Sequence, residues 1–321
     1  MLGLFLEPDA AAYLSAMDID PLVKMHALEV VRKGYTLIKG TISPEQCREA
    51  IAAFRQFEAA NSAIFSENRD ANGHYPRIVN LHCAVPALLP LFTRNRVWLE
   101  VQDVLFGAPT ALYTSLFYEV GSEQPLHRDT PLFATRPEYL YFGTTVYLEP
   151  SDDGNGCLEV LEYGHALPEI DREAMARARY DSLEDVPAFD PQLWVDYQDA
   201  IAEQGRGRGL RSKKIPAEAG DSLIWHPQLP HGGSPVKDRS RTRFSLVMHN
   251  TPQGVPVYHQ NVFFQPTKPF SETAPWRYRG CEGREIADFA DGISFSGSTE
   301  RKYPLDQLRS TQQLELVTER S

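Results

Sequence analysis

Residues 110–250 contain a series of short segments that are rich in β-branched and aromatic residues. The segments are ALYTSLFYEV, YLYFGTTVYLEP, GCLEVLE, DSLIWHP and TRFSLVMHN, and turn signals such as DDGNG, EAGD and HGGSP separate them. Several short strands with frequent turns are typical of a β-sandwich or a barrel. The sequence therefore predicts a single β core in this part of the chain.

Helical sequence flanks this core. A helical stretch opens residues 20–60, and GYTLIKG then predicts a strand closed by Gly40. Ser43 and Pro44 have the residue types of an N-cap and a first helical position, and they precede the predicted helix CREAIAAFRQFEAAN. Residues 84–106 also have a helical pattern, and Gly107 terminates the predicted helix. We expect a helical N-terminal layer against the β core.

A polar stretch between residues 166 and 214 interrupts the strands. It contains REAMARARY and LWVDYQDAIAEQ, which predict helices, and insertions of this size between strands often form a lid or a substrate loop. We expect one domain over residues 1–321. Its parts are a helical layer at about 1–108, a β core at about 110–165 and 215–265, and the insertion at about 166–214.

Charge and cysteine content exclude several classes of protein. The formal net charge is -11, so a sequence-independent grip on nucleic acid or on an anionic membrane is not expected, because both require a positive field. No apolar run approaches the roughly 20 residues of a membrane span, and no basic segment precedes the apolar N-terminus as in a signal peptide. The 4 cysteines are scattered without a CxxC pair, which predicts free thiols in a reducing cytoplasm.

The residues LHRD carry the strongest chemical signal. In an extended segment, residues i and i+2 project from the same face, so His127 and Asp129 can offer a nitrogen and an oxygen to one metal ion. A third ligand is available in GDSLIWHPQLPHGGSP, where His231 follows an apolar strand. An HxD triplet alone is weak, since most are turns or caps, but the conjunction with a later histidine and a following arginine strand is more specific. Two histidines and one carboxylate form the facial triad of non-haem iron(II) oxygenases.

Several stretches, in order, resemble the phytanoyl-CoA dioxygenase family of Fe(II)/2-oxoglutarate oxygenases. They are GYTLIKGTISPEQCREAI, LHRDT, DDGNGCLEVLEYGH, GDSLIWHPQLPHGGSP and RTRFSLVMH, and together they cover roughly residues 34–250. The resemblance implies a double-stranded β-helix core of the jelly-roll or cupin type. It also implies Fe(II) held by His127, Asp129 and His231, with 2-oxoglutarate and O2 as cosubstrates.

The resemblance implies an arginine that binds the distal carboxylate of 2-oxoglutarate. Arg241 and Arg243 share the same strand parity, so parity does not separate them. Arg243 is preferred because Arg243-Phe244-Ser245 resembles the Arg-x-Ser of related oxygenases, in which the hydroxyl of the serine shares the carboxylate. Arg241 remains the alternative.

The chain departs from the family pattern at two turns. The usual PGSH reads EYGH here, so His165 is retained while the turn differs. A serine often stands two residues after the distal histidine and helps to hold the cosubstrate. Gly233 occupies that place, so either Ser234 substitutes for the serine or the contact is missing.

Other polar residues are weaker candidates. Tyr113, Ser115 and Thr144 lie on predicted inward strands and could contact the cosubstrate, although core packing explains them equally well. On a strand, His226 and His231 would have opposite parity and face opposite sides. We therefore expect His226 to pack in the core or to support the metal site indirectly. We expect His249 to be a core or rim residue rather than a ligand.

Two further stretches have open interpretations. The basic run RGRGLRSKK could attract an anionic substrate, but a solvated loop explains it more simply. The stretch HYPRIVNLH, residues 74–82, could face the substrate.

We expect hydroxylation of a small-molecule metabolite, since related halogenases have a small residue where this chain has Asp129. Desaturation, epimerisation or ring formation at the same site remain alternatives. A non-catalytic metal-binding or ligand-binding module and a zinc hydrolase are rivals from other classes, but no HExxH motif supports hydrolysis. The oligomeric state is open.

Overall fold

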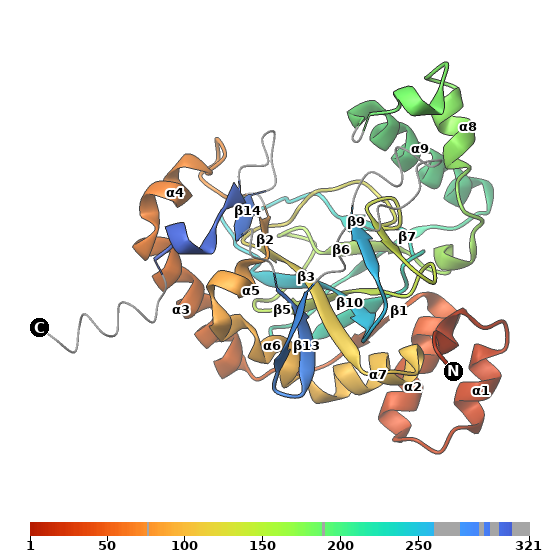
Figure 1. The fold of residues 1–321 in the computed structure, drawn as a ribbon, viewed down its shortest axis with the longest axis horizontal. Coiled ribbons are helices and arrows are strands. Elements are labelled where there is room, and N and C mark those ends of the chain that lie inside the picture. Colours follow the sequence, from red (N-terminus) through yellow and green to blue (C-terminus); the bar gives the residue numbers. More distant parts are fainter. Residues whose placement is uncertain (76, 188–189, 260–276, 289–291, 296–301, 310–321) are drawn as a thin grey trace, which may run out of the picture.

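Antiparallel β-sheets form the centre of the computed structural model, which describes residues 1–75, 77–187, 190–259, 277–288, 292–295 and 302–309 (Figure 1). The larger sheet has the strand order β1-β8-β5-β10-β3-β2-β14-β15, with β13 also pairing to β3 and to β12. Its strands are β1 (Tyr35–Ile38), β8 (Ser222–Trp225), β5 (Phe142–Tyr147), β10 (Ser245–Pro252), β3 (Thr110–Tyr118), β2 (Ile78–Val79), β14 (Ile293–Phe295), β15 (Lys302–Tyr303), β13 (Arg284–Ala287) and β12 (Tyr278–Cys281).

A smaller sheet has the order β7-β6-β9, with β7 (Ser212–Ile215), β6 (Leu158–Leu161) and β9 (His231–Gly233). A β-bridge between His127 and His231 adds the segment around His127 to this sheet. A separate pair joins β11 (Val257–His259) to β4 (Phe133–Thr135). The β segments predicted from the sequence form β3, β5, β6, β8 and β10, and the predicted double-stranded β-helix is confirmed.

Helices cover the larger sheet, as expected for the N-terminal layer. They are α1 (Ala10–Ala16), α2 (Pro21–Lys33), α3 (Pro44–Ala60), α4 (Ser62–Glu67), α5 (Leu81–Ala84), α6 (Pro90–Thr93) and α7 (Arg96–Phe106). Short 3-10 turns lie at Leu4–Leu6, Pro86–Leu88, Gly164–Ala166, Leu183–Asp185 and Leu305–Gln307. A main core cluster joins α2, α3 and α7 to β3, β5 and β10 through residues such as Val30, Phe54, Leu105, Phe142 and Leu246.

Local sequence signals explain where several helices begin and end. The side chain of Ser43 accepts from the Gln46 N–H and the side chain of Gln46 accepts in return, which is a capping box, and Pro44 follows as predicted. Helix α2 ends at Gly34, whose φ of 89° lies in the left-handed region that favours glycine.

Two predicted boundaries need correction. Residues 84–106 do not form one helix, because Pro86 and Pro90 divide the stretch into the end of α5, a 3-10 turn, α6 and α7. The predicted insertion extends to residue 214, but β7 already begins at Ser212. Part of the basic run therefore forms an exposed strand, in which Lys213 pairs with Glu162 at 3.0 Å and Lys214 pairs with Asp153.

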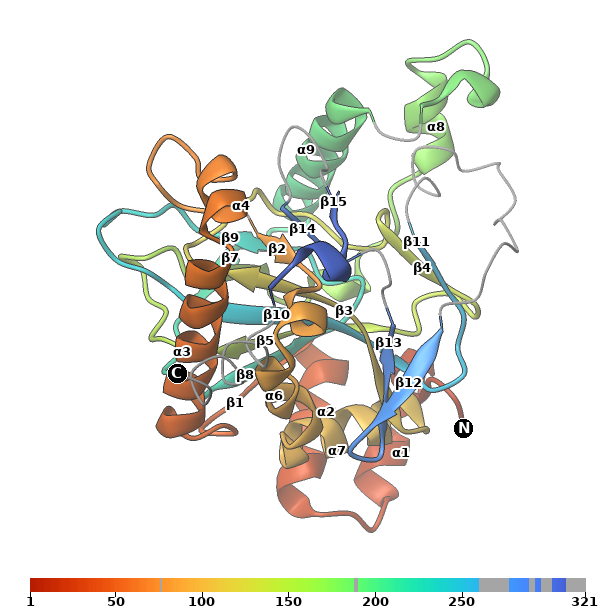
Figure 2. The ribbon, with the colours of Figure 1, turned by 60° about the vertical axis from the view of Figure 1, so that its left-hand side comes forward.

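The insertion carries α8 (Arg172–Arg177) and α9 (Pro191–Gly207), as its helical pattern predicted. These helices lie at the opposite end of the molecule from α1 and α2 (Figures 1 and 2). Within the described residues, no helix has the length and apolar character needed to cross a membrane.

Candidate metal centre

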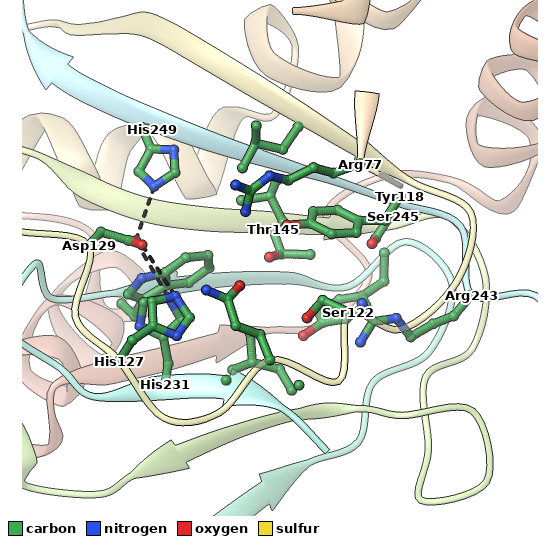
Figure 3. A pocket seen from close by; sticks show the side chains of 18 residues that line it. Arg77, Tyr118, Ser122, His127, Asp129, Thr145, His231, Arg243, Ser245 and His249 are labelled. Carbon is green, nitrogen blue, oxygen red and sulfur yellow. Dashed lines mark hydrogen bonds and ion pairs between the residues drawn. The ribbon is translucent and has the colours of Figure 1, made fainter. Parts of the chain in front are cut away.

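A cavity lies between the two sheets, and residues far apart in the sequence line it (Figure 3). Strands β3, β5, β8 and β10 contribute to one wall, whereas β6, β9 and the segment 122–129 contribute to the other. The lining residues are Arg77, Leu116, Tyr118, Ser122, Gln124, His127, Asp129, Thr145, Tyr147, Leu158, Trp225, His231, Gly232, Gly233, Arg243, Ser245, Val247 and His249.

The three predicted metal ligands come together in this cavity. His127, Asp129 and His231 are buried, and one ligand atom from each lies within 4.8 Å of the others. The Nε2 of His127 is 3.6 Å from Oδ1 of Asp129, and the Nε2 of His231 is 3.5 Å from Oδ2. The geometry permits a shared metal ion, and the ligand role itself stays a prediction.

Main-chain hydrogen bonds fix the positions of the two histidines. The N–H of each donates to the carbonyl oxygen of the other, at 2.9 Å in both directions. The Nδ1 of His127 lies 2.8 Å from the carbonyl oxygen of Pro125, and the Nδ1 of His231 lies 3.0 Å from that of Leu229. A carbonyl oxygen only accepts, so both Nδ1 atoms carry a proton, and it is Nε2 that a neutral imidazole in this position offers to a metal.

The protonation states also suit metal binding. Burial lowers the pKa of His231 to about 4, so its imidazole is neutral at physiological pH. Burial alone would raise the pKa of Asp129, but the neighbouring His231 and His249 outweigh it and hold this pKa well below its usual range. Neutral imidazole and ionised carboxylate are the forms that bind a metal ion.

His249 contacts the centre in a way that the sequence analysis did not anticipate. Its Nε2 lies 3.0 Å from Oδ2 of Asp129, and its ring packs against Phe133 in a tilted arrangement with centroids 4.1 Å apart. This contact orients the carboxylate. The signal was present in the sequence, because position 249 shares strand parity with Arg243 and Ser245, which also line the cavity.

Of the two arginine candidates, Arg243 enters the cavity and Arg241 does not. Arg243 is buried, and its Nη1 donates to the carbonyl oxygen of Gly156. Arg241 pairs with Asp152 at 2.7 and 3.0 Å, and its side chain is 40% exposed. Ser245, the serine of the Arg-x-Ser pattern, also lines the cavity, and its contact with the cosubstrate stays a prediction.

Thr144 and Tyr113 are not among the cavity-lining residues. The hydroxyl of Thr144 donates to the carbonyl oxygen of Met248 at 2.9 Å, while its neighbour Thr145 faces the cavity because side chains alternate along β5. Tyr113 falls at a β-bulge where the register of β10 with β3 passes from Thr114 directly to Leu112. The inward parity assumed from the sequence is also wrong in the regular part of β3, where Leu116 and Tyr118 line the cavity and Ser115 instead contacts His82.

Several lining residues were missed or assigned only to packing. Ser122, Gln124, Thr145 and Tyr147 were not singled out, and the buried Trp225 also reaches the cavity. No short sequence motif marks them.

Ser234 is fully buried and its hydroxyl donates to the carbonyl oxygen of Cys157 at 2.9 Å, so it does not face the cavity. His226 packs against Phe5 and His165, with ring centroids 5.2 Å apart in both cases, as its parity predicted.

The insertion borders the metal centre through Arg128 and Trp194. Arg128 is fully buried between two predicted ligands and donates to the carbonyl oxygens of Gly164, Leu167 and Pro168, each at 3.2 Å. The ring of Trp194 on α9 lies 5.6 Å from that of His127. The loop that precedes α8 is therefore tied directly to the HxD segment.

Comparison with known proteins shows the family to which this chain belongs. The phytanoyl-CoA dioxygenase model matches residues 30–244. No curated protein sequence matches the chain.

Solved structures share the fold at low sequence identity. The epimerase SnoN, solved in complex with Fe3+, α-ketoglutarate and nogalamycin RO, is 18% identical, with 85% of this chain and 98% of that chain covered and a TM-score of 0.55. EctD from S. alaskensis, with 2-oxoglutarate and 5-hydroxyectoine, is 15% identical over 84% and 88% of the two chains, with a TM-score of 0.58. The carbocyclase SnoK from nogalamycin biosynthesis is 13% identical over 76% and 87%, with a TM-score of 0.53.

Proposed function

Because the chain belongs to the phytanoyl-CoA dioxygenase family, we propose that it is an Fe(II)- and 2-oxoglutarate-dependent dioxygenase that hydroxylates a small-molecule metabolite. The observation that carries this proposal is the presence, in one cavity, of the His127–Asp129–His231 cluster and the buried guanidinium of Arg243. The cavity holds about 570 Å³ of empty space, which includes space open to solvent.

The donor set fits iron. Two neutral imidazoles and one carboxylate on one side of an octahedral ion leave positions open for other ligands, and this set is characteristic of non-haem Fe(II) oxygenases. Burial of the three side chains excludes bulk water from their side of the ion. The His249 contact on Oδ2 of Asp129 restricts rotation of the carboxylate.

Buried polar atoms without partners fit 2-oxoglutarate. Within the described residues, Nε of Arg243, Oγ of Ser245, Oγ1 of Thr145 and the hydroxyl of Tyr147 have no hydrogen-bond partner, although all four side chains line the cavity. A buried polar group without a partner is costly, so these atoms favour a polar ligand. A guanidinium with adjacent hydroxyls is suited to a carboxylate.

Fe(II), once bound with 2-oxoglutarate and O2, supplies oxidation of an unactivated C–H bond and yields succinate and CO2. The protein would hold the metal through His127, Asp129 and His231 and orient the cosubstrate through Arg243 and Ser245. The walls of the cavity would shield the reacting C–H from water. We propose hydroxylation because Asp129 keeps a carboxylate at the position where related halogenases have a small residue. Epimerisation and ring closure, the reactions named for SnoN and SnoK, are the alternatives that product analysis distinguishes.

The first test is spectroscopic. Protein loaded anaerobically with Fe(II) and 2-oxoglutarate should show the weak visible charge-transfer band of the chelate, and Asp129→Ala should lose iron affinity and the band. Iron that binds without the band in the wild type would refute the cosubstrate assignment.

A screen for succinate release across metabolites would then identify the substrate. Isotopically labelled O2 should place one oxygen atom in the product. A product without the label, or one that has lost two hydrogens, would exclude hydroxylation.

A further inference from the structure

The cavity contains a second arginine that the proposed function does not use. Arg77 lies directly before β2 and lines the cavity together with Arg243 (Figure 3). We propose that the substrate is an organic anion, with a carboxylate or a phosphate group, and that Arg77 binds this group. The inference rests on the proposed function and specifies its substrate class.

The order of strands separates Arg77 from the predicted cosubstrate groups. Among the cavity-lining side chains, the buried polar atoms without partners belong to β8, β5 and β10 or to Arg243 just before β10, and these strands are consecutive in the sheet. Strand β2 lies beyond β3 on the other side of β10, with Ile78 opposite Phe117 and Val79 opposite Leu116. Arg77 therefore reaches the cavity from beyond β3, away from the strands that carry the predicted cosubstrate groups.

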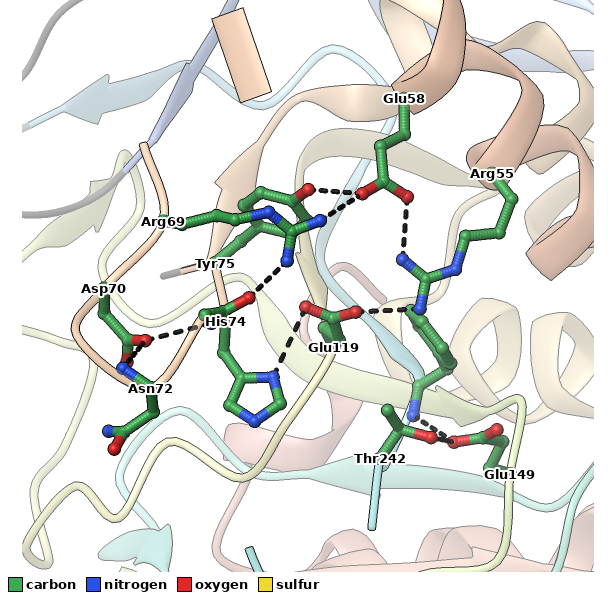
Figure 4. A network of polar contacts seen from close by, with 12 residues as sticks. Arg55, Glu58, Arg69, Asp70, Asn72, His74, Tyr75, Glu119, Glu149 and Thr242 are labelled. Atoms are coloured by element: carbon green, nitrogen blue, oxygen red, sulfur yellow. Dashed lines mark hydrogen bonds and ion pairs between the residues drawn. The ribbon is translucent and has the colours of Figure 1, made fainter. Parts of the chain in front are cut away.

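Salt bridges hold the segment that carries Arg77 (Figure 4). Glu58 on α3 accepts from the hydroxyl of Tyr75 and pairs with Arg69 at 2.7 Å. The Nδ1 of His74 lies 3.7 Å from Oε2 of the buried Glu119. These contacts hold His74 and Tyr75, and the pairing of β2 with β3 holds the residues that follow Arg77.

The same network includes the main chain of Arg243. Arg55 joins the two carboxylates, with 2.7 Å to Glu58 and 2.8 Å to Glu119. The carbonyl oxygen of Glu119 accepts from the N–H of Arg243 at 2.8 Å. One rigid frame therefore supports both arginines, which is what recognition of two separate anions requires.

Charge among the cavity-lining groups supports a second anion. Fe(II) and Arg243 together would balance Asp129 and the two carboxylates of 2-oxoglutarate, whereas Arg77 adds one further positive charge to the lining. A guanidinium has five N–H donors, so one arginine can contact neighbouring protein groups and a ligand at the same time.

Leu116 and Val247 form apolar parts of the wall made by β3 and β10, and Leu158 on β6 adds an apolar side chain from the facing wall. These features together fit a carbon skeleton that ends in an acidic group.

Matched probes test the proposal without knowledge of the natural substrate. Phenylacetate, hexanoate and phenyl phosphate are titrated calorimetrically into anaerobic enzyme loaded with Fe(II) and 2-oxoglutarate, beside phenylacetamide, hexanamide and phenol. At least one acid should bind roughly ten-fold or more tightly than its neutral partner, as expected for a charge-assisted hydrogen bond. The acid that shows the preference distinguishes a carboxylate from a phosphate.

Variants assign the preference to Arg77. Arg77→Gln should reduce the ratio to about two-fold or less, while Arg77→Lys should keep part of it, because Lys retains the charge but not the fork of donors. Both variants should bind 2-oxoglutarate within about three-fold of the wild type and should keep its thermal unfolding midpoint.

Three results would overturn the proposal. Acids could bind no better than their neutral partners, or Arg77→Gln could leave the preference intact. Alternatively, Arg77→Gln could weaken 2-oxoglutarate binding as much as Arg243→Gln does, which would make Arg77 part of the cosubstrate site. Failure of the proposed function is distinguishable, because the charge-transfer band would then be absent in the wild type.

Discussion

At the residue scale, Arg241 and Arg243 differ in environment although they are two positions apart. Arg243 is buried in the cavity, whereas the exposed Arg241 pairs with Asp152. Arg243→Gln should raise the Kd of 2-oxoglutarate by about 100-fold, the loss of two charge-assisted hydrogen bonds. Arg241→Gln should change it less than about three-fold, since exposed ion pairs contribute little. Anaerobic titration of the charge-transfer band measures both, and equal effects would contradict the assignment.

Ser122 is positioned to supply the hydroxyl that the family pattern places two residues after the distal histidine. A Cβ added to Gly233 would lie 2.6 Å from Oγ of Ser122 and 2.9 Å from the main-chain nitrogen of Glu123, so the structure leaves no room for a side chain there. Ser122→Ala should raise the Kd of 2-oxoglutarate by about five-fold, the value of one neutral hydrogen bond. Ser234→Ala is the control and should leave this Kd unchanged. The reverse pattern would assign the role to Ser234.

The sequence predicted those site residues whose signal is local. The HxD spacing and the strand before His231 predicted the three side chains that the fold brings together, and the Arg-x-Ser pattern favoured Arg243, which lines the cavity, over Arg241, which does not. The roles of these residues stay predictions. The prediction that Thr144 faces the cavity was wrong, because the sequence does not show which face of β5 is inward. The alternation of side chains along β5 itself holds, since Thr145 and Tyr147 line the cavity. Arg77 lies in HYPRIVNLH, the stretch that the sequence left open as one that could face the substrate, and it lines the cavity. Ser122 lies in a connecting segment without a motif, and only the tertiary fold brings it there.

At the element scale, the close approach of β5 and β8 shapes one end of the cavity. Gly143 pairs with Trp225, and a Cβ at Gly143 would lie 2.1 Å from the Trp225 ring, whose centroid is 4.8 Å from that of His231. Gly143→Ala should therefore displace the ring, destabilise the protein by about 1–3 kcal/mol and weaken iron binding. Urea unfolding and iron titration measure the two effects.

Gly207 at the end of α9 provides the matched control. A Cβ there meets no atom within 4 Å, so Gly207→Ala should be neutral or slightly stabilising. If Gly143→Ala were as well tolerated as this control, the ring would have room to move and the steric account would be wrong.

At the scale of the whole molecule, the helical layer and the β core share one interior. A single cluster of buried side chains includes Leu4 near the N-terminus, Phe54 on α3, Met248 on β10 and Leu308 beyond β15. The division of the chain into one domain with an insertion stays a proposal. The shared core leads us to expect one cooperative unfolding transition for these parts.

Buried histidines should make that transition sensitive to acid. Burial, assisted by the charge of Arg279, lowers the pKa of His82 to about 3, against about 6.5 in an unfolded chain. Between these values the unfolded state binds a proton that the folded state does not, so the stabilisation is complete above pH 6.5 and decreases as the pH falls below it. The contribution is about 1.4 kcal/mol per pH unit.

Urea unfolding between pH 5 and 6, with a chelator to remove metal, tests this dependence. As the pH falls, the free energy of unfolding should decrease more steeply for the wild type than for His82→Gln. The difference between the two slopes should correspond to about one additional proton taken up on unfolding. The comparison uses slopes because the variant also changes the contact between Nδ1 of His82 and Oγ of Ser115, at 2.6 Å, which shifts stability at every pH. Parallel slopes would mean that His82 takes up a proton in the folded protein, and its burial would then not control its ionisation.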